Sequence, residues 1–127
     1  MDAYETIFVV KSGLTDDEAT KLIEKVREVI PRSDGEVLAL ENWGRRKMAY
    51  EVRREKRGIY AIVHYNGGGV TVGAVERLLR LDEAVLKYIT VKIGKDQIGK
   101  TTQIQEEKFS YRSREGTRFP APAAVAS

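Results

Sequence analysis

Positively charged side chains are concentrated in one short stretch of this chain, and their spacing allows them to bind phosphate. Residues 41–58 contain seven Lys or Arg against three Asp or Glu, a local balance of +4, whereas the whole chain has a formal net charge of only +3. Guanidinium and ammonium groups gathered in this way suit a polyanion partner such as RNA. These cations are Arg45, Arg46, Lys47, Arg53, Arg54, Lys56 and Arg57.

The same cations have a second possible role. Lys and Arg on the edge strand of a sheet prevent pairing with other sheets, which is a structural function and needs no ligand. Some of them are also expected to pair with Glu41, Glu51 or Glu55 across strands, which stabilises a surface only weakly. Spacing alone leaves both roles open.

The residues that most enzymes and metal sites require are scarce. The chain has no cysteine and a single histidine, His64, which excludes disulfides, thiol chemistry, Cys-ligated metals and sites built from several histidines. The acidic pair Asp82-Glu83 is typical of a turn. The run Gly67-Gly68-Gly69 lacks the Gly-Lys-Ser/Thr of a phosphate loop. We therefore predict no enzymatic activity, no metal and no cofactor.

Hydrophobic periodicity predicts the element order β-α-β-β-α-β. One helix is expected to begin after the N-cap Thr15, with Glu18 completing a capping box, and to end at Pro31; the second spans about residues 71–81. This order is the ferredoxin-like α+β fold, a four-stranded antiparallel sheet with two helices on one face and the other face available. The predicted strands are residues 4–11, 36–52, 59–66 and 85–93.

The long basic strand at residues 36–52 is expected to bend at Gly44 and to lie at the edge of the sheet. Met48 and Tyr50 are predicted to point inward, leaving Arg45 to Lys47 on the outside. A charged hairpin loop is expected over residues 53–58.

The sequence also predicts where the folded domain ends and what the tail after it contacts. The domain is expected to span residues 1–93 and to be followed by a flexible tail, 94–127, which ends in Pro-Ala-Pro-Ala-Ala-Val-Ala-Ser. Aromatic residues in the tail are interleaved with cations, so Arg112, Arg114 and Arg118 are predicted to contact RNA or a partner protein. The chain shows no signal peptide and no membrane-spanning run, which predicts an intracellular, soluble protein.

The chain resembles the bacterial small-subunit ribosomal protein six family over about residues 3–93. The residues that carry the resemblance are Tyr4-Glu5, Trp43-Gly44-Arg45-Arg46-Lys47-Met48-Ala49-Tyr50, Gly58-Ile59-Tyr60 and Leu79-Arg80-Leu81-Asp82-Glu83-Ala84-Val85-Leu86-Lys87-Tyr88. The sequence departs from the family at Glu51, where many relatives have proline, and at Lys87, where arginine is common and forms a bidentate fork.

The resemblance implies a structural constituent of the ribosome in the cytoplasm. Such a protein binds small-subunit ribosomal RNA together with small-subunit ribosomal protein eighteen during assembly of the platform, with no DNA and no membrane as partners. The family positions that match are Tyr4, Arg46, Lys47, Tyr50, Lys87 and Lys92. The predicted RNA- or partner-binding residues are therefore Tyr4, Arg45, Arg46, Lys47, Arg53, Arg54, Lys56, Arg57, Lys87 and Lys92.

Two other functions share this element order. An acylphosphatase-type enzyme needs an arginine in the anion-binding loop after the first strand, and residues 11–14 contain none. A regulatory ligand-binding module would form homodimers through the available sheet face, for which Ile7, Val9, Ile62 and Ile89 are the candidate contacts.

Overall fold

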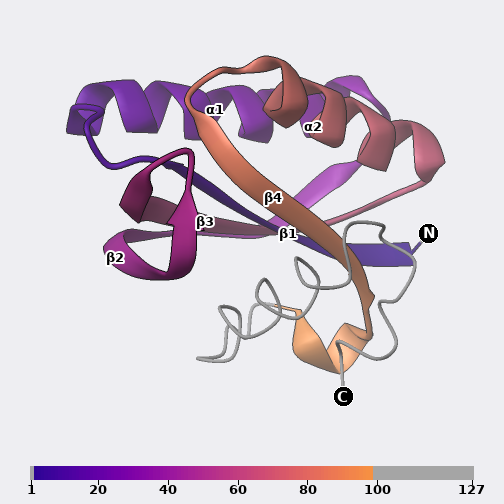
Figure 1. Ribbon diagram of the computed structural model, residues 1–127. Coiled ribbons are helices and arrows are strands. Elements are labelled where there is room, and N and C mark those ends of the chain that lie inside the picture. Colours follow the sequence, from indigo (N-terminus) through magenta and orange to yellow (C-terminus); the bar gives the residue numbers. More distant parts are fainter. Residues whose placement is uncertain (1, 99–127) are drawn as a thin grey trace.

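The chain folds into one antiparallel sheet with two helices packed on one face (Figure 1). The computed structural model describes residues 2–98. The sheet order is β2-β3-β1-β4, so β1 is an interior strand and β2 is an edge strand. This confirms the predicted ferredoxin-like α+β fold. Its elements are β1 (Asp2–Lys11), α1 (Asp16–Arg32), β2 (Glu36–Val52), β3 (Glu55–Gly67), α2 (Gly69–Leu81), β4 (Val85–Ile93) and a short 3-10 helix, η1 (Lys95–Gln97).

The helix-facing side of the sheet holds the main core. Alternate residues of β1 and β3 meet the apolar stripes of α1 and α2, and the cluster includes Phe8, Val26, Val63 and Leu79. Tyr65 lies in this core with its hydroxyl hydrogen-bonded to Thr6 Oγ1 at 2.9 Å. Burial raises the pKa of Tyr65 to about 12, so its neutral form stabilises the fold below pH 10 and this contribution is lost as the pH rises through about 12.

The predicted start of α1 is confirmed, and its predicted end is wrong by one residue. Thr15 accepts from the Glu18 backbone and the Glu18 carboxylate accepts from the Thr15 backbone, which is the capping box. The helix continues through Pro31 to Arg32. Ile30 is fully buried, and Ser33 donates to the carbonyls of the last turn, so packing and this cap outweigh the preference of a pre-proline residue.

The opposite face of the sheet does not stay available. The residues predicted to be open there, Ile7, Val9, Ile62 and Ile89, are each at most 3% exposed. They form a second cluster with Met48 from the bent strand β2, and Trp43 and Val52 pack against it. Such buried side chains do not offer the surface that a homodimer through this face requires.

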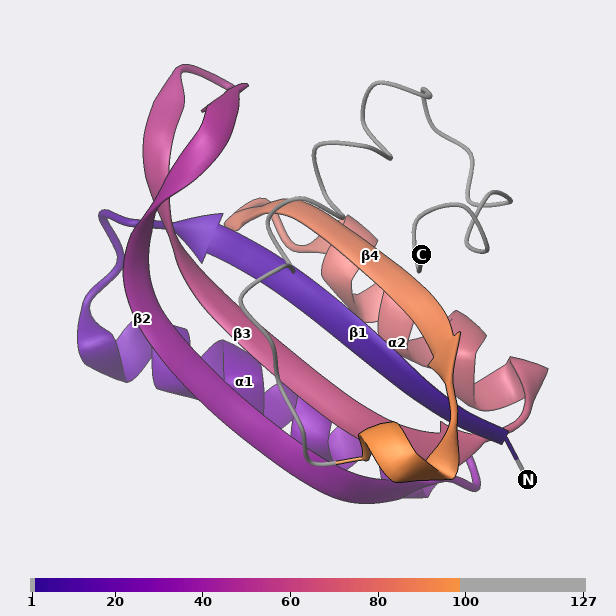
Figure 2. The same cartoon turned by 90° about the horizontal axis from the view of Figure 1, so that it is seen from below.

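A hairpin arm extends the edge of the sheet. The last residue pair between β1 and β3 is Lys11 and Gly58, so β2 and β3 continue beyond it without a third strand. Figure 2 shows this twisted hairpin projecting past the end of β1. We call residues 47–57 the arm. As predicted, β2 bends at Gly44, where the backbone has φ +78° and the register shifts.

The predicted loop over residues 53–58 is wrong. The turn consists of Arg53 and Arg54 alone, with φ of 51° and 68°, and β3 begins at Glu55. Two consecutive residues with positive φ are the geometry of a tight two-residue hairpin. Asn and Gly are the usual signals for this turn, and an Arg-Arg pair gives no such signal in the sequence.

Gly58 permits the close approach of strands where the arm leaves the sheet. A Cβ at this position would overlap with Val9 Cγ1 and would lie 3.1 Å from the Val10 carbonyl oxygen. We expect Gly58→Ala to lower the free energy of unfolding by about 1–3 kcal/mol, because the core beneath it is already packed. Gly73→Ala, in α2 with open space around it, is the matched control and should raise stability by about 0.5–1 kcal/mol. Urea unfolding measures both, and equal effects from the two substitutions would contradict the packing argument.

Candidate nucleic-acid interface

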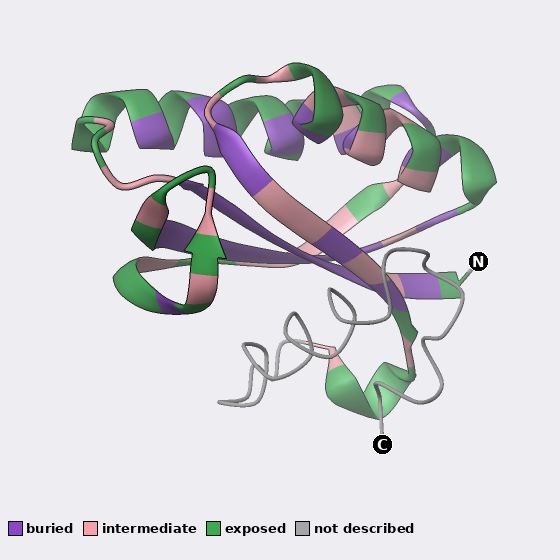
Figure 3. Cartoon of the chain, in the orientation of Figure 1, coloured by how far each residue is buried: buried purple, intermediate pink, exposed green. Residues whose placement is uncertain are grey.

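The arm contains a charge excess equal to that of the whole chain. Residues 47–57 include five Lys or Arg and two Glu, a balance of +3, and the rest of the chain has 17 of each sign, 22 minus 5 and 19 minus 2. The side chains of Lys47, Arg54, Lys56 and Arg57 are exposed on the arm, and Arg46 is exposed at its base. Figure 3 shows the contrast between this exposed hairpin and the buried strand β1. The net positive charge of the chain is therefore equal to the charge of the arm.

Two of these cations lie directly opposite one another. Lys47 pairs with Arg57 in the register of β2 and β3. Like charges in this position destabilise a hairpin. The stability of the hairpin therefore does not explain the pair, and the two roles that the sequence leaves open, protection of the sheet edge and binding of a polyanion, both apply to it.

Arg45 is bound to its own chain at the base of the arm. Its guanidinium donates from Nε to the Ser12 carbonyl at 3.1 Å and from Nη2 to the Leu14 carbonyl at 2.8 Å. Nη1 lies 3.2 Å from Asp16 Oδ1. The sequence predicted an RNA or partner contact here, and the structure places the side chain on the loop between β1 and α1.

Arg53 makes the corresponding contacts at the tip of the arm. It donates from Nη1 to the Glu83 carbonyl at 3.1 Å and from Nη2 to the Val85 carbonyl at 3.2 Å. Glu83 lies in the connection between α2 and β4, and Val85 is the first residue of β4. Arg54, its neighbour in the turn, is exposed as Arg53 is, but makes no such contact within residues 2–98.

Aromatic rings support two of the predicted cations. The Arg46 guanidinium lies over the Trp43 ring at 4.7 Å, and the indole N–H donates to Glu41 Oε1 at 2.8 Å. The Lys87 ammonium lies over the Tyr50 ring at 4.3 Å. Burial raises the pKa of Tyr50, so the ring stays neutral at physiological pH and keeps the π face that attracts a cation. These contacts hold Arg46 and Lys87 in defined positions.

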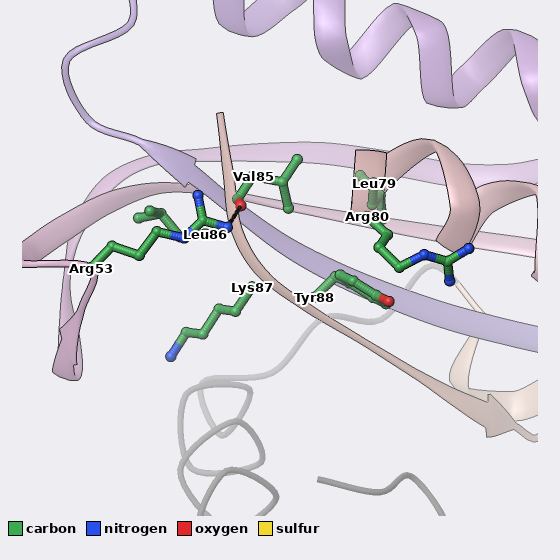
Figure 4. Close-up of a pocket in the computed structure, with 7 residues that line it drawn as sticks. All are labelled: Arg53, Leu79, Arg80, Val85, Leu86, Lys87 and Tyr88. Carbon is green, nitrogen blue, oxygen red and sulfur yellow. Dashed lines mark hydrogen bonds between the residues drawn. The ribbon is translucent and has the colours of Figure 1, made fainter. Parts of the chain in front are cut away.

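A pocket of about 270 Å³ lies where the tip of the arm meets α2 and β4 (Figure 4). Its lining includes three cations and no acid: Arg53, Leu79, Arg80, Val85, Leu86, Lys87 and Tyr88. The sequence prediction missed Arg80. A cation in the last turn of a helix is common because it complements the helix dipole, so its position in the sequence did not distinguish it.

The other predicted site residues lie away from the arm or outside the described residues. Tyr4 lies on the helix-facing side of the sheet, with its ring 5.9 Å from that of Tyr65, and Lys92 forms an exposed ion pair with Asp2 at 3.3 Å. Tyr4 and Lys92 are paired with each other across β1 and β4. The predicted tail contacts Arg112, Arg114 and Arg118 lie outside the described residues.

The described residues form neither a metal-binding cluster nor a membrane-spanning helix. Within residues 2–98, no group of three or more His, Asp or Glu is placed to hold a metal ion. No helix in the same part of the chain combines the length and apolar character needed to cross a membrane.

Comparisons with known proteins agree on one family. The model of the family described as ribosomal protein S6 matches residues 3–92. A small ribosomal subunit protein bS6 from Sulfurovum is 40% identical over 97 residues, which cover 76% of each chain. One from Geobacter metallireducens is 42% identical over 93 residues, covering 73% of this chain and 79% of that one.

A solved structure supports the fold. The 30S ribosomal protein S6 from Thermotoga maritima superposes with a TM-score of 0.69 at 20% identity, covering 92% of this chain and 98% of that chain. At this level of identity the match establishes the fold alone.

Proposed function

The chain belongs to the ribosomal protein S6 family, and from this premise we propose that it binds small-subunit ribosomal RNA together with small-subunit ribosomal protein eighteen. Membership makes it a structural constituent of the small ribosomal subunit in the bacterial cytoplasm. The observation that best supports RNA binding is the arm, which presents Lys47, Arg54, Lys56 and Arg57 to solvent on one projecting hairpin.

The proposed interaction with RNA is mainly electrostatic. Exposed guanidinium and ammonium groups pair with phosphates and position the protein, whereas they read little sequence. An RNA helix has a wide, shallow minor groove bordered by phosphates. A narrow, basic hairpin can bind along these phosphates by recognising the shape of the helix. Arg46, fixed over Trp43, extends this surface to the base of the arm.

The partner protein is proposed to bind along β2. This strand forms one edge of the sheet, so within the described residues its outer backbone groups have no neighbouring strand. An exposed strand edge accepts a partner segment through main-chain hydrogen bonds. Tyr4 and Lys92, near the other end of β1 and β4, are proposed as a separate contact.

The division of the chain into a domain, residues 1–93, and a tail, residues 94–127, remains a proposal. The described part of the tail includes η1 (Lys95–Gln97). We propose that Arg112, Arg114 and Arg118 add contacts to the assembled particle.

The salt dependence of binding tests the proposed function. We expect the full chain, mixed with in-vitro-transcribed small-subunit ribosomal RNA and protein eighteen, to form a complex whose log affinity falls linearly with log salt. Four arm cations, each neutralising one phosphate, predict a slope on the order of −3, since each contact contributes about −0.7 to −0.9. A filter-binding titration between about 50 and 200 mM salt measures it. Binding that does not change with salt, or no complex at low salt, would exclude this mode of RNA recognition.

A further inference from the structure

We propose that Arg53 and Arg45 are positioning residues, which fix the arm at its tip and base in the RNA-binding conformation and do not themselves contact phosphate. The inference rests on the proposed function. It assigns these two arginines a different role from that of the neighbouring cations, for which no contact with a backbone carbonyl is seen in residues 2–98. It follows from where each guanidinium donates its hydrogen bonds.

Arg53 joins the tip of the arm to a distant part of the fold. Its two terminal nitrogens donate to the carbonyls of Glu83 and Val85, some thirty positions further along the chain. A planar guanidinium that donates two bonds at once fixes direction as well as distance. Figure 4 shows its side chain extended from the arm toward the start of β4, with the bond to Val85 drawn. The tip is therefore attached where the sheet and α2 are already packed.

Arg45 forms the equivalent attachment at the base. Its guanidinium binds two carbonyls, of Ser12 and Leu14, and the carboxylate of Asp16. These groups surround the capped start of α1, which is itself held by Thr15 and Glu18. Both arginines thus use backbone carbonyls as acceptors, and a guanidinium used in this way has fewer N–H groups left for a phosphate.

The arm has no third strand, and its apolar contacts with the rest of the fold are those of Met48 and Val52 with the second cluster, to which Arg53 and Arg45 add polar attachments. An isolated two-stranded hairpin is marginally stable in water, and this one also places like charges opposite each other at Lys47 and Arg57. If the arm were detached from the rest of the fold for part of the time, only the remaining fraction of molecules could bind RNA. The apparent affinity for RNA would fall in proportion to that fraction. Fixing it in advance lowers the entropic cost of binding.

Arg53 and Arg54 form a matched pair for the test. They are neighbours in the turn and both have positive φ. Substitution by alanine removes one positive charge at either position and keeps the Cβ, so the two changes affect the backbone alike. Arg54→Ala should reduce the salt slope of RNA binding by about 0.7–0.9, the value for one lost phosphate contact. Arg53→Ala should weaken binding about tenfold at every salt concentration with the slope unchanged, because only the competent fraction falls.

Two further readouts separate positioning from contact. Amide hydrogen exchange over residues 47–57 should speed up in Arg53→Ala and remain as in the wild type in Arg54→Ala, with the sheet amides of β1 unchanged in both. Arg53→Lys keeps the positive charge but cannot donate two hydrogen bonds at once as the guanidinium does. This variant would therefore restore RNA binding if Arg53 contacted phosphate, and would not restore it if Arg53 attaches the arm. A reduced salt slope in Arg53→Ala, or wild-type exchange in the arm, would overturn the proposal.

Trp43 reports on the base of the arm. It is the only tryptophan in the chain, and it packs against the second cluster. Arg45→Ala should increase acrylamide quenching of its fluorescence, whereas Lys47→Ala, an equal loss of charge, should not. The exchange and quenching measurements need no RNA. If neither the wild type nor any variant bound RNA, the proposed function would be wrong. The exchange and quenching measurements would still test whether the two arginines attach the arm.

Discussion

Glu5→Ala is expected to destabilise the protein strongly, by on the order of 3 kcal/mol. Glu5 and His64 are directly opposite on β1 and β3, with Oε2 and Nε2 3.0 Å apart, and both side chains are almost completely buried. Removing the carboxylate leaves the imidazole in a buried site without this hydrogen bond, and water cannot easily replace it. Thermal or urea unfolding monitored by circular dichroism measures the loss.

An exposed pair between β1 and β4 provides the control. Asp2 and Lys92 form an ion pair at 3.3 Å with both side chains more than half exposed. Asp2→Ala should change stability by less than about 1 kcal/mol, because solvent screens the interaction. Glu5→Gln keeps an acceptor for His64 and should cost less than Glu5→Ala. Similar small losses in Glu5→Ala and Asp2→Ala would show that the buried pair does not stabilise the sheet.

Removing the opposed pair of cations on the arm is expected to abolish most RNA affinity without loss of stability. In the variant Lys47→Ala with Arg57→Ala, two phosphate contacts disappear, and two charge-assisted hydrogen bonds correspond to a loss on the order of 100-fold. The like-charge repulsion within the hairpin disappears as well, so the melting temperature should stay constant or rise. Filter binding at low salt and thermal unfolding measure the two effects.

The control for this variant removes the same charge elsewhere. Lys21 and Lys25 are exposed on α1, in the helix layer and not on the arm (Figure 1), and Lys21→Ala with Lys25→Ala lowers the net charge equally. If binding followed net charge alone, both double variants would weaken it to the same extent. If the arm cations served only to protect the sheet edge, their removal would leave RNA affinity intact and promote self-association.

The sequence alone determined the architecture and the location of the charge. Periodicity of 2 and 3.6 residues, the capping box at Thr15 and Glu18, and the glycine at position 44 are local signals, and each describes a residue by its near neighbours in the chain. For that reason β4, the start of α1, the bend in β2 and the burial of Met48 agree with expectation. The family also follows from local runs of residues, which the comparisons confirm.

Only the tertiary structure decided what the cations do. Arg45 and Arg54 look equivalent in sequence and both are exposed, yet within residues 2–98 Arg45 donates to carbonyls about thirty positions away and Arg54 does not. The two-residue turn, the pocket containing Arg80 and the buried Glu5–His64 pair depend in the same way on segments that meet only when the sheet forms. Hydrogen-bond partners and burial are set by distance in space, and side-chain patterns along the chain do not encode which distant backbone carbonyl a guanidinium will reach.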